Sequence, residues 1–388
     1  MKSVHALNLI AAPIVAMSLT APGVIAGEDS TAPLPPPASV EEESSASVLD
    51  ALWDLPVLYS NKENPFLQKL SILGRYQGQY AVVDSDQGNF DDWENRRWRL
   101  GAGAQLFNRI DLKGYINIDD DFNPFYSSLE ELHMTIKVVD ALSLTVGKQK
   151  PEWGYEWTTS SSKILTMERG LLTNQLLPAK SSGIAAHGEV SGFSYYVGAF
   201  SGDLDDEFGN FDGGTFYVAS VGYDFSETCG MDKMAWRLDY LYNDPEEGDT
   251  AAKKYDNSFA TSLVLGQGDF TVVNELMYAS GQSPDVYGLS IMPSYDITDK
   301  LQVVGRYQYA HGDDDGLRAQ SRYERKVPSI TDGGHGEDYH AFYLGLNYYI
   351  HGHGLKLMSG LEYATLDGGS DGGDYDGLSW VSGIRLNF

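Results

Sequence analysis

Arg97 and Arg99 are the residues whose types and spacing first suggest chemistry in this sequence. They lie two apart in a segment of alternating apolar and polar residues, so both side chains project from one face of a β-strand. Lys113 has a matching position on the next expected strand and can join them. Such a basic strip attracts anions, or the carboxylates of sugars and peptides. The alternative is that these cations pair with Asp111 or Glu131 and only brace neighbouring strands.

No group of residues in the chain suggests catalysis. The motifs G-x-S-x-G and H-E-x-x-H, the P-loop and the Rossmann fingerprint are all absent from the sequence. The single cysteine, Cys229, excludes an intramolecular disulfide and a Cys-rich zinc site. We therefore expect no enzyme activity, no cofactor and no metal site.

Charge and composition narrow the class of protein further. The 388 residues include 55 Asp and Glu against 27 Lys and Arg, a formal charge of −28, which argues against binding to nucleic acid. Glycine and tyrosine are both frequent, with 42 and 25 residues, and such a composition favours many strands joined by polar turns.

The N-terminal region has the features of an exported protein. Lys2 precedes a mainly apolar stretch, and Val24-Ile25-Ala26 fits a cleavage site, so we predict a signal peptide over residues 1–26. A periplasmic leader is expected over 27–69, with a proline-rich part at 31–37. Residues 47–55 within it are compatible with a short helix that packs at the pore mouth or at the barrel base.

From Leu70 onward the hydrophobic pattern has a period of two, which is typical of half-buried strands. Most of the expected strands have about 9–13 residues, enough to cross a bilayer with tilt. The sixteen expected strands cover residues 70–83, 94–108, 109–118, 129–138, 141–150, 182–190, 192–200, 214–225, 232–242, 256–266, 269–280, 286–297, 300–311, 338–350, 354–365 and 377–388.

Short and long connections alternate between these strands. Short turns on one side and long loops on the other are typical of bacterial outer-membrane barrels, so we predict an all-β, antiparallel transmembrane barrel over 70–388. The terminal Phe388 ends an alternating strand, and we interpret it as an assembly signal. The long connections are expected at 84–93, 119–128, 151–181, 201–213, 243–255, 312–337 and 366–376.

The middle of the chain resembles a known family. The run from Val146 to Glu156, followed by Ser160–Ser162 and by Glu168-Arg169, is similar to the phosphate-selective porin O/P family, with Glu152 where that family has a proline. The segments 95–101 and 195–202 resemble two further strands of that family. The resemblance implies a sixteen-stranded, trimeric porin whose long loop folds inward and narrows the channel. In this chain that loop would be 151–181.

Several side chains of the loop 151–181 are apolar, and they would be costly to expose to water. Folding the loop against the inner wall would bury them. We expect Lys163, Glu168 and Arg169 to be the charged residues of this constriction loop. Glu168 and Arg169 either anchor the loop by salt bridges to the wall or take part in solute selection.

The candidate anion site comprises the basic residues expected to line the pore, namely Arg75, Arg97, Arg99, Lys113 and Lys137. Acidic residues expected on the inward faces are about as numerous as the basic ones. Selectivity for phosphate or other anions, as the family resemblance implies, and a general or mildly cation-preferring pore therefore both remain open.

The function predicted from the sequence is passive diffusion of small hydrophilic solutes or inorganic ions through a porin of the bacterial outer membrane. The expected partners are those solutes and ions, outer-membrane lipids with lipopolysaccharide, and two further copies of the chain in a homotrimer. The alternative is a structural or adhesive barrel whose function lies in its acidic extracellular loops. Soluble secretion is the third possibility.

Overall fold

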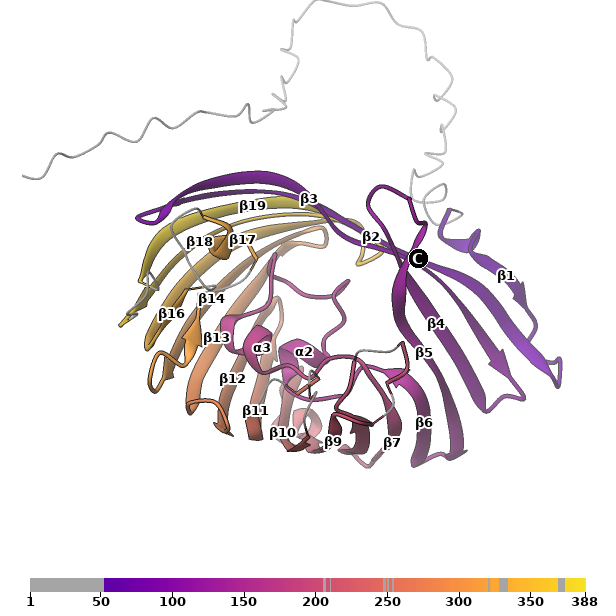
Figure 1. Ribbon diagram of the computed structural model, residues 1–388. Helices are drawn as coiled ribbons and strands as arrows, with labels where there is room; N and C mark the ends of the chain where they lie inside the picture. Colours follow the sequence, from indigo (N-terminus) through magenta and orange to yellow (C-terminus); the bar gives the residue numbers. More distant parts are fainter. Residues whose placement is uncertain are drawn as a thin grey trace, which may run out of the picture. The chain divides into compact units, whose positions relative to one another are not determined.

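A computed structural model of the chain describes residues 52–204, 207–209, 211–246, 249, 251–252, 255–319, 322–327, 334–368 and 374–388. Within this part of the chain, sixteen antiparallel strands form a closed barrel, in which each strand pairs with its neighbours in sequence and β19 pairs with β2 (Figure 1). The predicted signal peptide (1–26) and most of the predicted leader lie outside the described residues.

The barrel strands follow the predicted order along the chain. The first eight are β2 (Leu67–Ser85), β3 (Gly88–Leu106), β4 (Ile110–Ile118), β5 (Tyr126–Val139), β6 (Leu142–Gln149), β7 (Ser181–Val190), β8 (Phe193–Ser201) and β9 (Gly214–Asp224). The second eight are β10 (Lys233–Pro245), β11 (Tyr255–Gln267), β12 (Phe270–Gly281), β13 (Val286–Thr298), β14 (Leu301–Gly312), β17 (Asp338–His351), β18 (Leu355–Asp367) and β19 (Tyr375–Asn387).

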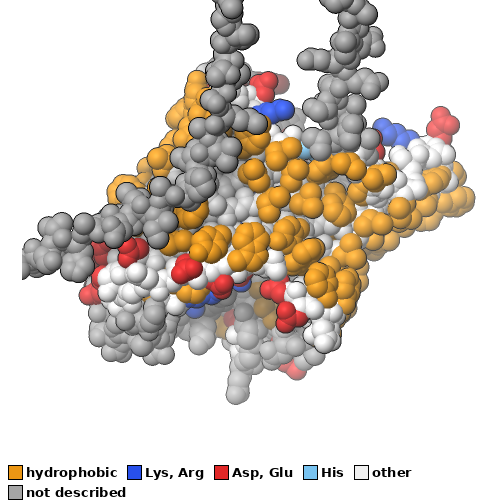
Figure 2. Space-filling view, turned by 90° about the horizontal axis from the view of Figure 1, so that it is seen from above, with side chains coloured by type: hydrophobic (Ala, Val, Ile, Leu, Met, Phe, Trp, Pro, Cys, Tyr) orange, Lys and Arg blue, Asp and Glu red, His pale blue; other side chains and the backbone are white. Residues whose placement is uncertain are grey.

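The two faces of the barrel wall have opposite chemistry. Apolar side chains cover the outer face, and Figure 2 shows them gathered in a broad area with acidic groups toward its margins. Examples on successive strands are Leu100, Leu112, Leu132, Val146, Ile184 and Val197, which are 38–58% exposed. Polar and charged residues such as Gln77 and Glu131 are buried on the inner face. Because lipid cannot hydrate polar groups, this arrangement suits a barrel in a membrane.

One predicted loop is wrong. Residues 84–93 were expected to form a long connection, but β2 and β3 continue as paired strands to a tight turn at Asp86 and Gln87. Their outward residues include polar groups, and the hydroxyl of Tyr80 donates to Asp91 at 2.8 Å. The hydrophobic alternation is therefore lost here although the backbone ladder continues, and the sequence pattern does not show the strand.

The connection after β14 contains structure that the sequence did not predict. It includes β15 (Leu317–Arg318), which pairs with β16 (His335–Gly336), and a turn of 3-10 helix, η1 (Glu324–Lys326). Leu317 and Tyr323 are almost fully buried. We call the described residues 313–319, 322–327 and 334–337 the insert. At the other end of the barrel, the turn after β9 contains α4 (Ser226–Cys229).

The long connection between β6 and β7 spans residues 150–180 and carries α2 (Tyr155–Thr158) and α3 (Leu171–Leu176). Figure 1 shows both short helices inside the ring of strands. We call residues 150–180 the inner segment. Among the described residues, no helix is both long and apolar enough to span a bilayer.

The barrel closes at a seam between β2 and β19. The N–H of Gly74 donates to the carbonyl of Phe388 at 3.0 Å, and the N–H of Phe388 donates back at 3.1 Å. A Cβ on Gly74 would lie 2.1 Å from the Phe388 ring, so only glycine leaves room for this aromatic side chain.

The chain before β2 packs on the same seam. The short strand β1 (Val57–Ser60) pairs with β2 at Leu70 and Ser71, beyond the point where β19 ends. Residues 52–54 are helical, whereas the predicted helix start at 47 lies outside the described residues. Trp53 Nε1 donates to the carbonyl of Asn387 at 2.9 Å, and its ring stacks on His351. This edge of β2 is thereby covered rather than left open.

Candidate functional site

The inner segment is tied to one side of the barrel by buried polar contacts. Arg306 on β14 reaches Glu156 of α2 at 2.8 Å and Glu362 on β18 at 2.9 Å, and the Arg306 side chain is 1% exposed. Lys356 on β18 donates to the carbonyl of Ile164 at 2.7 Å. These contacts hold the segment firmly against the wall, because each ends on a charged group or a backbone carbonyl.

Apolar packing supports the same contact. Trp153, Met167, Leu171 and Leu176 of the inner segment are at most 3% exposed. The wall beneath them carries small inward side chains, and this row of alanines leaves space for the segment. The alanines are Ala260, Ala279, Ala310, Ala341 and Ala364. Burial of each large apolar side chain stabilises this arrangement by roughly 1.5–3 kcal/mol.

The other side of the lumen stays open. A cavity of about 330 Å³ lies between the inner segment and the wall formed by β2–β8. Its lining contains seven Lys or Arg and three Glu side chains, an excess of four formal positive charges in a chain of net charge −28. The basic residues are Arg75, Arg97, Arg99, Lys113, Lys150, Arg169 and Lys180, and the acidic residues are Glu130, Glu131 and Glu152.

Five of these charges form an alternating chain of ion pairs. Arg99 contacts Glu130 at 2.8 Å, and Lys113 contacts Glu131 at 2.8 Å. Lys180 lies between the two carboxylates and binds both, with Glu131 at 2.8 Å. Because the three cations share two carboxylates, this chain retains one formal positive charge.

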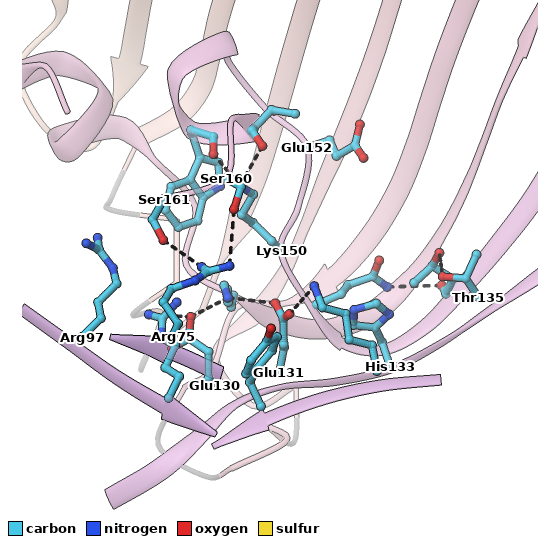
Figure 3. Close-up of a pocket in the computed structure, with 18 of the residues that line it drawn as sticks. Arg75, Arg97, Glu130, Glu131, His133, Thr135, Lys150, Glu152, Ser160 and Ser161 are labelled. Carbon is cyan, nitrogen blue, oxygen red and sulfur yellow. Dashed lines mark hydrogen bonds and ion pairs between the residues drawn. The ribbon is translucent and has the colours of Figure 1, made fainter. Parts of the chain in front are cut away.

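Arg75 and Arg97 have a different environment, as Figure 3 shows. Arg75 donates to the hydroxyl of Ser161 at 2.8 Å and to Asn387 Oδ1 at 3.2 Å. Arg97 donates to Gln77 Oε1 at 2.6 Å. All of these acceptors are neutral, and no described carboxylate lies within ion-pair distance of either guanidinium. Since arginine stays protonated, both groups keep a full positive charge at the cavity.

Lys150 enters the cavity from the start of the inner segment. Its Nζ donates to the carbonyls of Trp157 at 2.6 Å and of Thr158 at 2.8 Å. Burial, together with the nearby cations Arg169 and Lys180, lowers the pKa of Lys150 to about 6. With this pKa, Lys150 gains positive charge as the pH falls through about 6.

A closed barrel with an apolar exterior and a polar, partly filled lumen has the architecture of an outer-membrane channel. Comparison with protein families matches residues 98–367 to the family described as "Putative beta-barrel porin-2, OmpL-like". The chain belongs to this family of β-barrel porins. It is therefore an outer-membrane protein. Comparison with curated protein sequences gives no significant match.

Solved structures share the fold of this porin at low sequence identity. OmpF of Salmonella typhi, in a complex with daunomycin, is 13% identical with a TM-score of 0.58, and the match covers 86% of this chain and 100% of that chain. The DcaP channel of Acinetobacter baumannii is 11% identical with a TM-score of 0.57, covering 85% and 100%. A trimer form of in-vitro folded OmpT of Vibrio cholerae is 15% identical with a TM-score of 0.53, covering 82% and 99%.

The porin brings together four of the five residues expected to form an anion site. Arg75, Arg97, Arg99 and Lys113 all line the open cavity. Lys137 does not, because it lies on the exposed end of β5 and pairs with Asp140 at 2.8 Å.

The three predicted residues of the constriction loop occupy different environments. Lys163 is exposed and does not line the cavity. Glu168 contacts Arg96 at 2.9 Å and accepts from Gln79 Nε2 at 2.8 Å. Burial alone would raise the pKa of Glu168, but the adjacent arginines outweigh it and hold this pKa below its ordinary range. Arg169 donates to the carbonyl of Glu156 at 2.9 Å and also borders the cavity.

Two β-bulges place charged residues in the lumen that simple alternation assigns outward. In β3 the register shifts so that Gln77 pairs with Arg97 and Gly78 pairs with Asn95, which leaves Arg96 as the extra residue. Arg96 is thereby able to reach Glu168 inside the porin. A bulge adds one unpaired residue and re-aims the side chains beside it.

The second bulge lies in β5. Tyr115 pairs with Glu131 and Ile116 pairs with Leu129, so Glu130 is the extra residue and joins Glu131 on the inner face. The sequence contains a sign of this bulge. Leu129 and Leu132 both face outward but lie three apart rather than two, and they flank two acidic residues. Asn95 and Trp98 flank two arginines in the same way.

Lys150 and Lys180 were not predicted as site residues. Both lie at the ends of the inner segment, where β6 ends and β7 begins, rather than on an inward strand face. Strand alternation cannot assign a direction to such residues. Their contribution follows only from the path of the segment.

Proposed function

We propose that this porin is a passive diffusion channel of the outer membrane that favours small anionic solutes, phosphate among them. The cavity between the inner segment and β2–β8 is the proposed route. The apolar outer face would contact the lipids and lipopolysaccharide of the membrane.

The observation that carries this proposal is the pair Arg75 and Arg97. Both guanidiniums border the cavity, and their hydrogen-bond acceptors are neutral. In a narrow lumen, charges are poorly screened compared with charges on exposed loops, where the Debye length is roughly 8–10 Å. Fixed lumen charges therefore dominate over the acidic exterior once a solute has entered. The similarity of segments 95–101 and 146–156 to phosphate-selective porins supports the same preference.

The experiment is a reversal-potential measurement across a planar bilayer in a KCl gradient, followed by addition of inorganic phosphate. The wild-type channel should prefer anions, and phosphate should reduce the current. The double variant Arg75→Gln/Arg97→Gln should shift the reversal potential toward cations and weaken the block.

Lys137→Gln is the matched control, because this variant removes one cation that lies outside the cavity. It should behave as the wild type does. A wild-type channel that prefers cations, with no change in the double variant, would refute the proposed anion preference.

The family resemblance also implies a homotrimer, and we include this assembly in the proposal. Chemical cross-linking of the protein in outer-membrane vesicles should give a band at three times the monomer mass. A monomer band alone would contradict it.

A further inference from the structure

The ring of Tyr115 lies beneath two cations of the cavity. The guanidinium carbon of Arg75 is 5.8 Å from the ring centroid, and Nζ of Lys113 is 5.4 Å from it. The Tyr115 side chain is 6% exposed and lies on β4, next to β3, which carries Arg97 and Arg99. A cation within about 6 Å of an aromatic centroid is attracted by the negative face of the ring.

Trp157 has the same relation to two basic side chains of the inner segment. Nζ of Lys150 and the guanidinium carbon of Arg169 each lie 5.1 Å from its ring centroid. Trp157 lines the same cavity as Tyr115, from the opposite side. Two rings therefore face the open route, and each supports two basic side chains.

A ring and a carboxylate hold a cation with different consequences for a passing solute. A carboxylate fixes the cation but cancels its charge, as Glu131 does for Lys113. A ring has no net charge, so it fixes the position and leaves the field of the cation intact. We propose that Tyr115 and Trp157 are positioning residues that set the strength of anion attraction, because the rings hold Arg75 and Arg169 in place without neutralising them. This inference rests on the proposed anion preference.

The wall is shaped to accommodate the first ring. Tyr115 pairs with Gly101 across β3 and β4, and a Cβ on Gly101 would lie 2.7 Å from the ring. Glycine at this position lets the ring lie flat against the wall rather than project into the cavity. The ring then presents its face to Arg75, whose hydrogen-bond acceptors are the neutral groups of Ser160, Ser161 and Asn387.

The test compares Tyr115→Leu with Tyr115→Phe in the full-length protein. Phenylalanine keeps the ring and loses only the hydroxyl, whereas leucine removes the ring and leaves a smaller apolar side chain. The readouts are the reversal potential in a KCl gradient and the concentration of inorganic phosphate that halves the current. Leucine should raise the half-blocking concentration about fivefold, equivalent to about 1 kcal/mol, and phenylalanine should leave it near the wild-type value.

Trp157→Leu and Trp157→Phe form a second pair in the inner segment rather than in the wall. If Tyr115→Leu fails to insert, as judged by heat-modifiable gel mobility, this pair carries the test. Two outcomes in an anion-preferring wild type would overturn this inference and leave the proposed function standing. In the first, the leucine variants have the same half-blocking phosphate concentration as the wild type. In the second, the phenylalanine variants raise that concentration as much as the leucine variants do. A wild type without anion preference would overturn the proposed function and this inference together.

Discussion

The two sides of this barrel use basic residues in opposite ways. On the side of β10–β19, Arg306 and Lys356 are almost completely buried and directed at the inner segment. On the side of β2–β8, Arg75 is only partly buried, borders a cavity and forms no ion pair with a described carboxylate. Residues of one chemical type therefore serve as anchors on the sealed side and as a source of electric field on the open side.

The two sides differ in whether a solute can reach the basic side chains, and not in whether an aromatic ring lies next to them. Arg306 also lies over a ring, 5.7 Å from the centroid of Tyr343. However, it is enclosed between Glu156 and Glu362, and no solute reaches it. The position of the inner segment thus determines which cations act on solutes, and this position depends on where the wall carries alanine.

The largest expected effect is on the sealed side. Arg306→Met should lower the free energy of unfolding by about 3–5 kcal/mol, because it leaves two buried carboxylates without their partner. Urea unfolding followed by tryptophan fluorescence measures this change. Arg97→Met on the open side should cost much less stability and instead alter ion preference. Equal losses of stability would remove the distinction between the two sides.

Removal of most of the inner segment is the next test. Deletion of residues 158–177 should raise single-channel conductance about twofold, because the segment occupies the lumen on the sealed side. Anion preference should fall at the same time, since Arg169 is removed with the segment. Unchanged conductance in a barrel that still inserts would show that the segment does not limit the pore.

A subtler change tests the flat wall beneath Tyr115. Gly101→Ala places a Cβ 2.2 Å from the carbonyl oxygen of Gly114, so overpacking should cost about 1–3 kcal/mol and displace the ring. Gly103→Ala is the matched control on the same strand face, where the nearest atom, of Leu73, is 3.4 Å away. Comparable thermal stability of the two variants would contradict the close packing.

The smallest expected effect is a dependence on pH. Because the pKa of Lys150 is lowered to about 6, its positive charge increases as the pH falls from 8 to 5, and anion preference should increase with it. Glu168 stays ionised over this range, since its pKa lies below the ordinary value and its charge is lost only in stronger acid.

The cavity also contains His133 and His187, so a variant is needed to isolate the contribution of Lys150. Lys150→Gln should reduce the shift in reversal potential between pH 8 and pH 5. An identical shift in this variant would show that Lys150 does not carry the pH dependence.

The sequence predicts the strands of this fold well because each crossing alternates between lipid and lumen. All sixteen strands are found in the expected order, with ends displaced by a few residues. Prediction fails where lipid no longer constrains the outer face, as in the hairpin around Asp86. It also fails for the insert, whose buried Leu317 and Tyr323 depend on contacts with distant strands.

The site residues are predictable where the direction of a side chain follows the alternation of inward and outward residues along a strand. Arg97 and Arg99 were assigned to the inward face, and both line the cavity, but the same alternation also gave Lys137, which lies on the exposed end of β5 and does not line it. Arg96 was not predicted to face the lumen, because a β-bulge changes the alternation at this point of β3. Lys180 was not predicted either. Its direction depends on the course of the inner segment, which has no repeating hydrophobic pattern.

The seam at Phe388 makes completion of the barrel depend on pairing between strands at opposite ends of the barrel sequence. Arg75 and Asn387, which are hydrogen-bonded across the seam, lie 312 residues apart along the chain. Closing so large a loop is among the slowest steps available to a β-protein, and until then β2 and β19 both present unpaired edges. A chain truncated by even one strand has no partner for β2, and its open edge would invite aggregation. Pairing of β19 with β2 is therefore the step that removes both exposed strand edges at once.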